Sequence, residues 1–171
     1  RTREGRWDDY CAFMNRQLTE LLTGYGPIGA IWFDGMWDKD IYPDGVTDST
    51  WRLTPQYALI HRLQPACLIA NNHHTTPFAG EDIQIFERDL PGENKAGLSG
   101  QAISRLPLET CETMNRSWGY RMTDQACKPP ADLIRLLVRA AGNDANLLLN
   151  VGPQPDGQLP DTALARLHEV G

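Results

Sequence analysis

The 171-residue sequence lacks the features that mark several common classes of enzyme and binding protein. It contains no nucleophile elbow, no phosphate-binding glycine loop and no dinucleotide-binding fingerprint. It has no Lys/Arg cluster and a net charge of -6, so we expect no nucleic-acid partner. With 41% hydrophobic and 22% charged residues, the composition is that of an ordinary globular protein, and we expect no membrane span.

The four cysteines show no CxxC pair and no Cys/His spacing typical of a zinc site. They are scattered along the chain as Cys11, Cys67, Cys111 and Cys127, and we expect buried free thiols. No cofactor or metal site is therefore predicted from them. The chain begins with RTREGRWDDY rather than Met, a start typical of a fragment that opens inside a helix.

The most informative segment is the apolar run IGAIWFDG at residues 28–35, which ends in the carboxylate of Asp34. An apolar run of this length between glycines predicts a buried strand of a parallel sheet. Parallel strands of α/β barrels present their C-terminal ends to the active site, so Asp34 is a candidate catalytic or ligand-binding residue. An Asp that caps the following turn would look the same in the sequence.

Apolar patterns predict strands that alternate with helices along the chain. Helices are predicted at residues 7–22, 54–63 and 131–141 and after Pro160, with Thr54 as an N-cap; strands are predicted at 28–35, 66–70, 83–86, 106–114 and 146–151. Residues 36–50 predict a polar loop. Alternating strands and helices favour an α/β fold with a parallel sheet, and the simplest closed form is a (β/α)8 barrel. Too few units are present for eight strands, so we predict the later part of such a barrel.

Carboxylates and aromatic side chains gather near the predicted strand ends and loops. The acids there are Asp34, Glu81, Asp82, Glu87, Asp89, Glu93 and Glu112. One ionised and one protonated carboxylate are the minimum for glycoside hydrolysis. Aromatic faces for a sugar ring are offered by Trp32, Trp37, Trp118 and Tyr120, and hydrogen bonds to hydroxyls by Asn71, Asn72, His73 and His74.

Other interpretations of these residues stay open. Trp32 lies within a predicted strand and fits a core position, and paired histidines are more often satisfied polar residues than ligands. His73 and His74 with an acid would also suit a metal-dependent hydrolase. A carbohydrate-binding segment without catalysis would use the same aromatic residues.

Three ordered motifs resemble the α-L-fucosidases of glycoside hydrolase family 29, in particular their Bacteroidetes-like members. They are WFDG at residues 32–35, ETCETMNRSWGY at 109–120 and NLLLNVGPQPDG at 146–157. The resemblance implies a retaining exo-α-L-fucosidase with a (β/α)8-like catalytic domain and a C-terminal β-sandwich. Residues 1–171 would then be part of one catalytic barrel domain, without its early strands and without the β-sandwich.

The resemblance also implies roles for individual residues. Asp34 would be the nucleophile that forms a covalent fucosyl-enzyme. The acid/base would come from the loop after the strand at residues 83–86, which favours Glu93, with Glu87 as the alternative. Trp32 and Trp118 match aromatic positions near fucose. Many relatives carry Asn-Asp-Arg where this chain has Asn71-Asn72-His73-His74, so His73 or His74 would replace an arginine contact.

The resemblance further implies a fucosylated oligosaccharide or glycoconjugate as substrate and no cofactor. Its members are commonly periplasmic or secreted, or lysosomal in eukaryotes, and we expect one of these compartments here. Neither composition nor motif predicts the oligomeric state.

Overall fold

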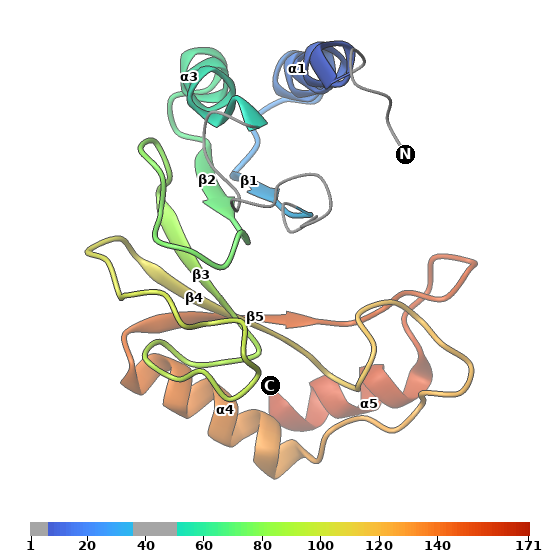
Figure 1. The fold of residues 1–171 in the computed structure, drawn as a ribbon. Helices are drawn as coiled ribbons and strands as arrows, with labels where there is room; N and C mark the ends of the chain where they lie inside the picture. Colours follow the sequence, from blue (N-terminus) through green and yellow to red (C-terminus); the bar gives the residue numbers. More distant parts are fainter. Residues whose placement is uncertain (1–6, 36–50) are drawn as a thin grey trace. The chain divides into compact units, whose positions relative to one another are not determined.

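The computed structural model describes residues 7–35 and 51–171 (Figure 1). In this part of the chain helices and strands alternate, except between residues 68 and 113, where three strands follow one another without a helix between them. In chain order the elements are α1 (Trp7–Gly24), β1 (Ala30–Phe33), α3 (Leu53–Leu63), β2 (Leu68–Asn71), β3 (Ile83–Glu87), β4 (Leu108–Thr113), α4 (Pro130–Gly142), β5 (Ala145–Asn150) and α5 (Asp161–Val170). Each predicted helix and strand is present. The predicted polar loop at residues 36–50 lies outside the described residues.

The strands follow one another in the sheet in the order of the sequence, β1-β2-β3-β4-β5. β1 pairs in parallel with β2, and β2 in parallel with β3. β4 pairs in parallel with β5 along the full length of both strands. Parallel strands that follow one another in sequence order are the arrangement of a (β/α)8 barrel. The predicted fold class is confirmed, because the chain forms part of such a barrel.

Contacts within the chain divide it into two compact units. Unit 1 runs to His73 and includes Pro77–Gln84, and unit 2 consists of His74–Thr76 and Ile85–Gly171. The expectation that residues 1–171 belong to a single catalytic domain stays a prediction. Each unit has its own core and is described by itself.

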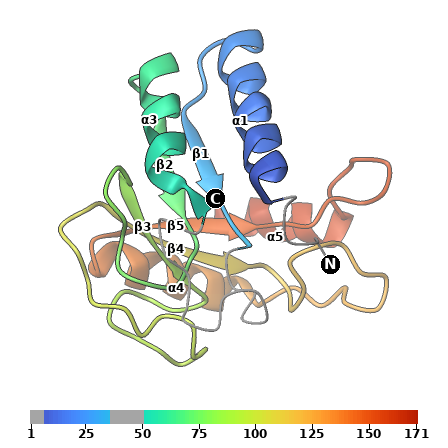
Figure 2. The same ribbon diagram turned by 45° about the horizontal axis from the view of Figure 1, so that its top comes forward.

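In unit 1, helices α1 and α3 lie beside strands β1 and β2 (Figure 2). Leu18 and Leu22 are four residues apart on α1, so they share one helix face, and both are buried. They join Tyr57 and Ile60 of α3 and Ile69 of β2 in one apolar cluster. Burial of this face is the main source of stability for the two helices, because helices in proteins gain most of their stability from the packing of an apolar face.

The predicted N-cap of α3 is wrong. The helix begins at Leu53, and its N-cap is Arg52, which has φ 55° and makes no side-chain capping hydrogen bond. Thr54 therefore lies inside the first turn rather than before it. Pro55 is still compatible with the helix, because the first-turn N–H groups have no partner within the helix. Arg52 instead forms an ion pair with Asp8 of α1.

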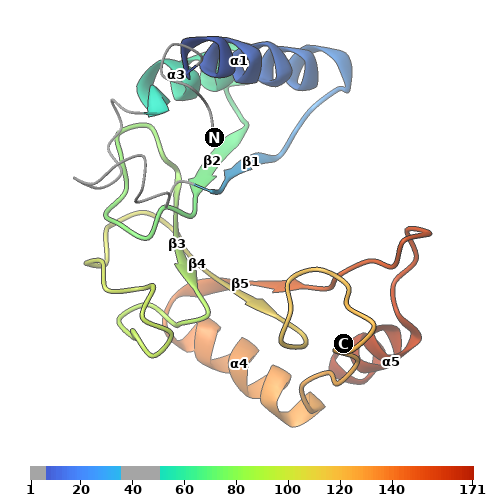
Figure 3. The ribbon, with the colours of Figure 1, turned by 45° about the vertical axis from the view of Figure 1, so that its right-hand side comes forward.

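In unit 2, α4 and α5 lie on one side of the paired strands β4 and β5 (Figure 3). The apolar core there is built on Met114, Leu133 and Ala163. Gly152, which follows β5, allows another segment to pass very close. A Cβ at this position would lie 2.5 Å from the backbone nitrogen of Tyr120 and 2.6 Å from the carbonyl carbon of Gly119.

The predicted strand at residues 28–35 is present as β1, but the prediction that it is buried is wrong. Exposure alternates along β1, and Trp32 is 36% exposed; β5 likewise has exposed and half-buried positions. β1 and β5 stand at the two ends of the strand order. Each therefore has a single neighbouring strand among the described residues, and less of its surface is covered.

The close approach at Gly152 predicts a large effect of one methyl group. Gly152→Ala should lower the free energy of unfolding by about 1–3 kcal/mol, because backbone atoms that cannot rotate away occupy the required space. Chemical denaturation of the full-length protein measures the change. Gly142→Ala is the matched control, since its Cβ would meet nothing within 4 Å. Equal stability of the two variants would contradict the prediction.

Candidate active site

Asp34 is the first residue after β1, and its side chain is exposed. The parallel ladder between β1 and β2 extends one step past the strands, because the Asn72 N–H donates to the Phe33 carbonyl at 2.9 Å. This places the side chain of Asn72 against Asp34, and Asn72 Nδ2 donates to Asp34 Oδ1 at 3.2 Å. The candidate nucleophile is thus a strand-end carboxylate with one oxygen held by the neighbouring strand.

A buried polar network lies next to this contact in unit 1. Tyr57 Oη of α3 donates to Glu81 Oε1 at 2.7 Å and accepts from Asn71 Nδ2 at 2.7 Å. His73 Nε2 lies 3.0 and 3.1 Å from the two oxygens of the same carboxylate. The side chains of His73 and Glu81 are only 2% and 1% exposed. In this structure His73 therefore belongs to the protein interior.

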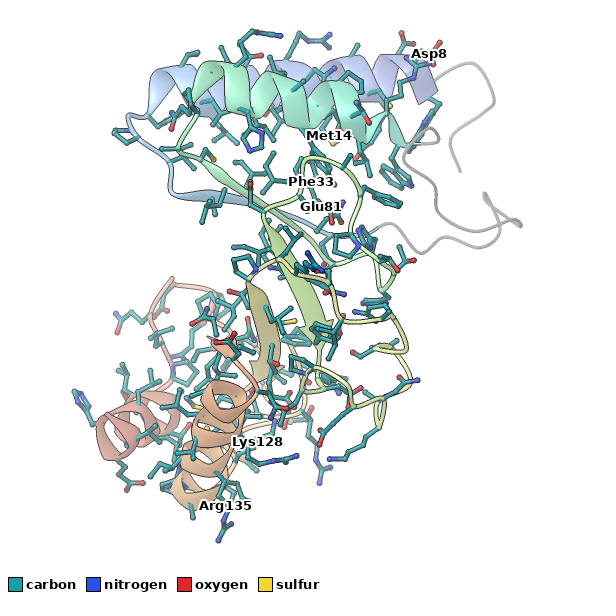
Figure 4. The ribbon with its side chains drawn as sticks, turned by 90° about the vertical axis from the view of Figure 1, so that its left-hand side faces the viewer. Asp8, Met14, Phe33, Glu81, Lys128 and Arg135 are labelled. Atoms are coloured by element: carbon teal, nitrogen blue, oxygen red, sulfur yellow. The ribbon has the colours of Figure 1, made fainter. Side chains whose placement is uncertain are left out.

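The network depends on a close approach of the loop before β3 to α3. Gly80 has φ 98°, and a Cβ there would lie 3.2 Å from Cδ2 of Tyr57. Glycine at this position lets the following Glu81 reach the tyrosine hydroxyl. The Tyr57 ring also packs edge-on against Phe33, with centroids 5.5 Å apart. Figure 4 labels Phe33 and Glu81, which both contact Tyr57.

Glu87 is the last residue of β3 and contacts the second histidine. His74 Nε2 lies 3.0 Å from Glu87 Oε2, and the two side chains are 19% and 13% exposed. Because a neutral imidazole can donate or accept a hydrogen bond, this contact is compatible with either charge state of the carboxyl group.

Glu93 lies in the loop between β3 and β4 and contacts two cations. Lys95 Nζ donates to Glu93 Oε1 at 2.8 Å, and Arg139 of α4 donates to the same oxygen. The hydrogen bond from Lys95 and the charges of Arg139 and Lys95 hold the pKa of Glu93 below its usual value, against the opposing effect of desolvation. A general acid requires the opposite shift, because it must be protonated before it acts.

Trp118 is held by residues at two strand ends of unit 2. Arg88, directly after β3, places its guanidinium 5.2 Å from the Trp118 ring centroid. Asn150, the last residue of β5, donates from Nδ2 to the Trp118 carbonyl at 2.7 Å. Trp118 is nevertheless 36% exposed. The arrangement presents a fixed aromatic surface, which suits stacking on a sugar.

The structure brings together some predicted residues and adds others. Asp34 and Asn72 meet, and His74 meets Glu87. Tyr57 was not predicted, because a tyrosine in the apolar stripe of a helix resembles a core residue. Trp37 lies outside the described residues.

Within residues 7–35 and 51–171, no three His, Cys, Asp or Glu side chains are grouped to hold a metal ion. His73 and His74 contact different carboxylates, Glu81 and Glu87. The alternative of a metal-dependent hydrolase built on the two histidines has no support in this arrangement. In the same part of the chain, no helix has the length and apolarity needed to cross a membrane.

The fold and these residues place the chain in a class of α/β-barrel proteins, those that carry carboxylates at their strand ends. Here exposed tryptophans accompany the carboxylates. The alpha-L-fucosidase family model matches residues 1–171, and the chain belongs to this family. Alpha-L-fucosidase 1 of Arabidopsis thaliana is 25% identical over 96% of the chain and 34% of its own length. Tissue alpha-L-fucosidase of Mus musculus is 28% identical over 91% of the chain and 32% of its own length.

Solved structures of fucosidases superpose on the chain. Alpha-L-fucosidase isoenzyme 1 from Paenibacillus thiaminolyticus matches with a TM-score of 0.77 and 32% identity, over 99% of this chain and 39% of that one. AlfC from Lactobacillus casei, in complex with its alpha-L-fucose product, matches with a TM-score of 0.72 and 27% identity, over 95% of this chain and 45% of that one. The chain spans about a third of the length of the curated relatives it matches.

The contacts of Glu93 predict how its pKa responds to a substitution. Lys95→Gln should raise the pKa of Glu93 toward its usual value, because the largest cause of the lowered pKa is removed. Carbon-13 NMR of the glutamate carboxyl groups in a pH titration measures it. Lys128→Gln is the matched control, since Lys128 pairs with Glu112 instead. An unchanged Glu93 titration in Lys95→Gln would contradict the prediction.

The lowered pKa of Glu93 also makes the stability of the fold depend on pH, in a direction that follows from the sign of the shift. A carboxyl whose pKa is lowered by folding stabilises the fold above its unfolded pKa, and this contribution is lost as the pH falls through the folded pKa. Lys95→Gln should therefore lower the free energy of unfolding at neutral pH and leave it unchanged once Glu93 is protonated in both states.

Proposed function

We propose that the protein carrying this chain is a retaining exo-α-L-fucosidase that removes terminal α-L-fucose from glycans. The observation that carries the proposal is the exposed carboxylate of Asp34 at the end of β1, held by Asn72, in a chain of the alpha-L-fucosidase family. Structures of AlfC contain alpha-L-fucose, 4-nitrophenyl-α-L-fucopyranoside and Fuc-α(1,6)-GlcNAc, and we extend the fucosylated class of ligand to this protein. Export to the periplasm, the exterior or the lysosome stays a prediction.

In the proposed reaction, Asp34 is the nucleophile. One oxygen of Asp34 attacks the anomeric carbon of fucose, and the glycosidic C–O bond breaks as a protonated carboxyl gives its proton to the leaving oxygen. The fucosyl group is then bound covalently to Asp34. The second carboxyl, now ionised, takes a proton from water, which attacks the anomeric carbon and releases Asp34 and fucose with retention.

The acid/base belongs to the segment that ends β3 or follows it, with Glu93 and Glu87 as the two candidates. Lys95 and Arg139 carry fixed charges, which favour the ionised form of Glu93. Glu87 contacts His74, an imidazole that carries no fixed charge, unlike the side chains of Lys95 and Arg139. These surroundings favour Glu87 as the acid/base, although the sequence pattern favoured Glu93.

Substrate contacts complete the proposal. Trp32 and Trp118 are each 36% exposed, so each has aromatic surface available for the apolar face of a sugar. His74 is partly exposed beside Glu87 and can bond a fucose hydroxyl. His73 contributes through the buried network rather than by contact with the sugar, because its side chain is 2% exposed.

Removal of the nucleophile should abolish turnover. Asp34→Ala in the full-length protein should lower kcat for an aryl α-L-fucoside by about a thousandfold or more, because no fucosyl-enzyme can form. Release of the aryl group measures the rate. Asp9→Ala removes an exposed carboxylate from α1 and should leave the rate unchanged. Wild-type turnover by Asp34→Ala would exclude Asp34 as the nucleophile.

Rescue by azide should identify the acid/base. An activated aryl fucoside needs no proton donor in the first step, and azide needs no base in the second, so azide restores turnover to a variant that keeps the nucleophile and lacks the acid/base. We expect rescue of Glu87→Ala with formation of α-fucosyl azide. Rescue of Glu93→Ala, with Glu87→Ala unaffected by azide, would assign the role to Glu93. NMR of the azide product gives its anomeric configuration.

A further inference from the structure

Asn72 lies between two residues that are fixed from the same side of the protein. Asn71 before it donates to Tyr57 Oη, and His73 after it contacts Glu81. Tyr57 and Glu81 are themselves joined by a hydrogen bond of 2.7 Å. The backbone on both sides of Asn72 is therefore anchored to one buried pair, and this restricts where the Asn72 side chain can point.

The anchoring pair is well suited to hold a fixed geometry. Glu81 accepts a hydrogen bond from Tyr57 and contacts His73 through both carboxyl oxygens, so this buried polar group has partners on two sides. The Tyr57 hydroxyl uses its single proton for Glu81 and its lone pair for Asn71. Loss of one member would leave others buried without their partners, so the network resists rearrangement.

Asn72 restricts the orientation of the Asp34 carboxylate through a direct hydrogen bond. Its amide binds Oδ1 at 3.2 Å and so limits rotation of the carboxylate, which leaves Oδ2 for attack on an anomeric carbon. Correct placement of a reacting group contributes strongly to rate, and a displacement of about 1 Å can cost about a hundredfold. A residue that holds Asn72 therefore acts on the reaction without contact with the substrate.

We propose that Tyr57, Glu81 and His73 are positioning residues that hold Asn72, and through it Asp34, in the orientation needed for attack. This inference rests on the proposed role of Asp34 as the nucleophile. In this arrangement His73 acts from the buried side of the site, without contact with the substrate. It also gives Tyr57, a residue of helix α3, a part in the formation of the fucosyl-enzyme.

The test uses Tyr57→Phe in the full-length protein, because this variant removes one oxygen and keeps the ring that packs against Phe33. We expect kcat for an aryl fucoside to fall by about tenfold to a hundredfold with little change in KM, since attack is impaired and binding is not. Covalent trapping by an activated 2-fluoro-fucoside should slow by the same factor. The kcat of Glu81→Gln should lie between the values of the wild type and Tyr57→Phe, because the amide oxygen of glutamine can still accept a hydrogen bond from Tyr57.

A double-mutant cycle separates positioning from general loss of structure. Asn72→Ala alone should lower kcat about as much as Tyr57→Phe, and Tyr57→Phe should cost little more when Asn72 is already absent. His61→Gln is the matched control, because it breaks another contact between a histidine and a carboxylate in unit 1, that of His61 with Asp82. Its melting temperature should fall while its kcat stays unchanged.

Two results would overturn the inference while the proposed function stands. One is an inactive Asp34→Ala together with wild-type kcat and trapping rate in Tyr57→Phe and Asn72→Ala. The other is a Tyr57→Phe effect on kcat that is equally large with and without Asn72. Full activity of Asp34→Ala would instead remove the proposed nucleophile. If Glu81→Gln fails to fold, the double-mutant cycle between Tyr57 and Asn72 still tests whether Tyr57 acts through Asn72.

Discussion

The register between β1 and β2 is the constraint on which the candidate site depends. Parallel pairing places Phe33 beside Asn71, so the next residue of each strand, Asp34 and Asn72, meet at the strand ends. A shift of one residue would turn every side chain of β2 to its opposite face. Asn71 would then lose its hydrogen bond to Tyr57, and Asn72 would lose its hydrogen bond to Asp34. One alignment of two short strands thus connects the helix layer with the exposed carboxylate.

Much of the fold could be predicted from the sequence, because helices and strands leave different periods in the apolar residues. The spacing of Leu18 and Leu22, about one helical turn apart on α1, indicates its buried face without knowledge of its partners. The start of α3 could not be predicted in the same way. Thr54 and Pro55 have the residue types of an N-cap and a first helical position, but the ion pair of Arg52 with Asp8 of α1 accompanies an earlier start.

The site was predictable only in part, for a related reason. A carboxylate after an apolar run is visible in the sequence, and Asp34 was found by it. Tyr57 was not, because its role comes from a hydroxyl that points toward Asn71 and Glu81, residues 14 and 24 positions away. Asn72 is recognisable in the sequence as a polar residue, but its contact with Asp34 can be predicted only when the strand register is known.

The choice between Glu87 and Glu93 shows how residue type and surroundings can disagree. Both are glutamates after an apolar strand, and sequence pattern favours Glu93. Its environment is set by Lys95, two positions away, and by Arg139, 46 positions away on α4. The hydrogen bond from Lys95 is the largest cause of the lowered pKa of Glu93, and the charge of Arg139, which cannot be read from the local sequence, lowers this pKa further. If Glu93 acts as the acid, its contacts with Lys95 and Arg139 must first be broken.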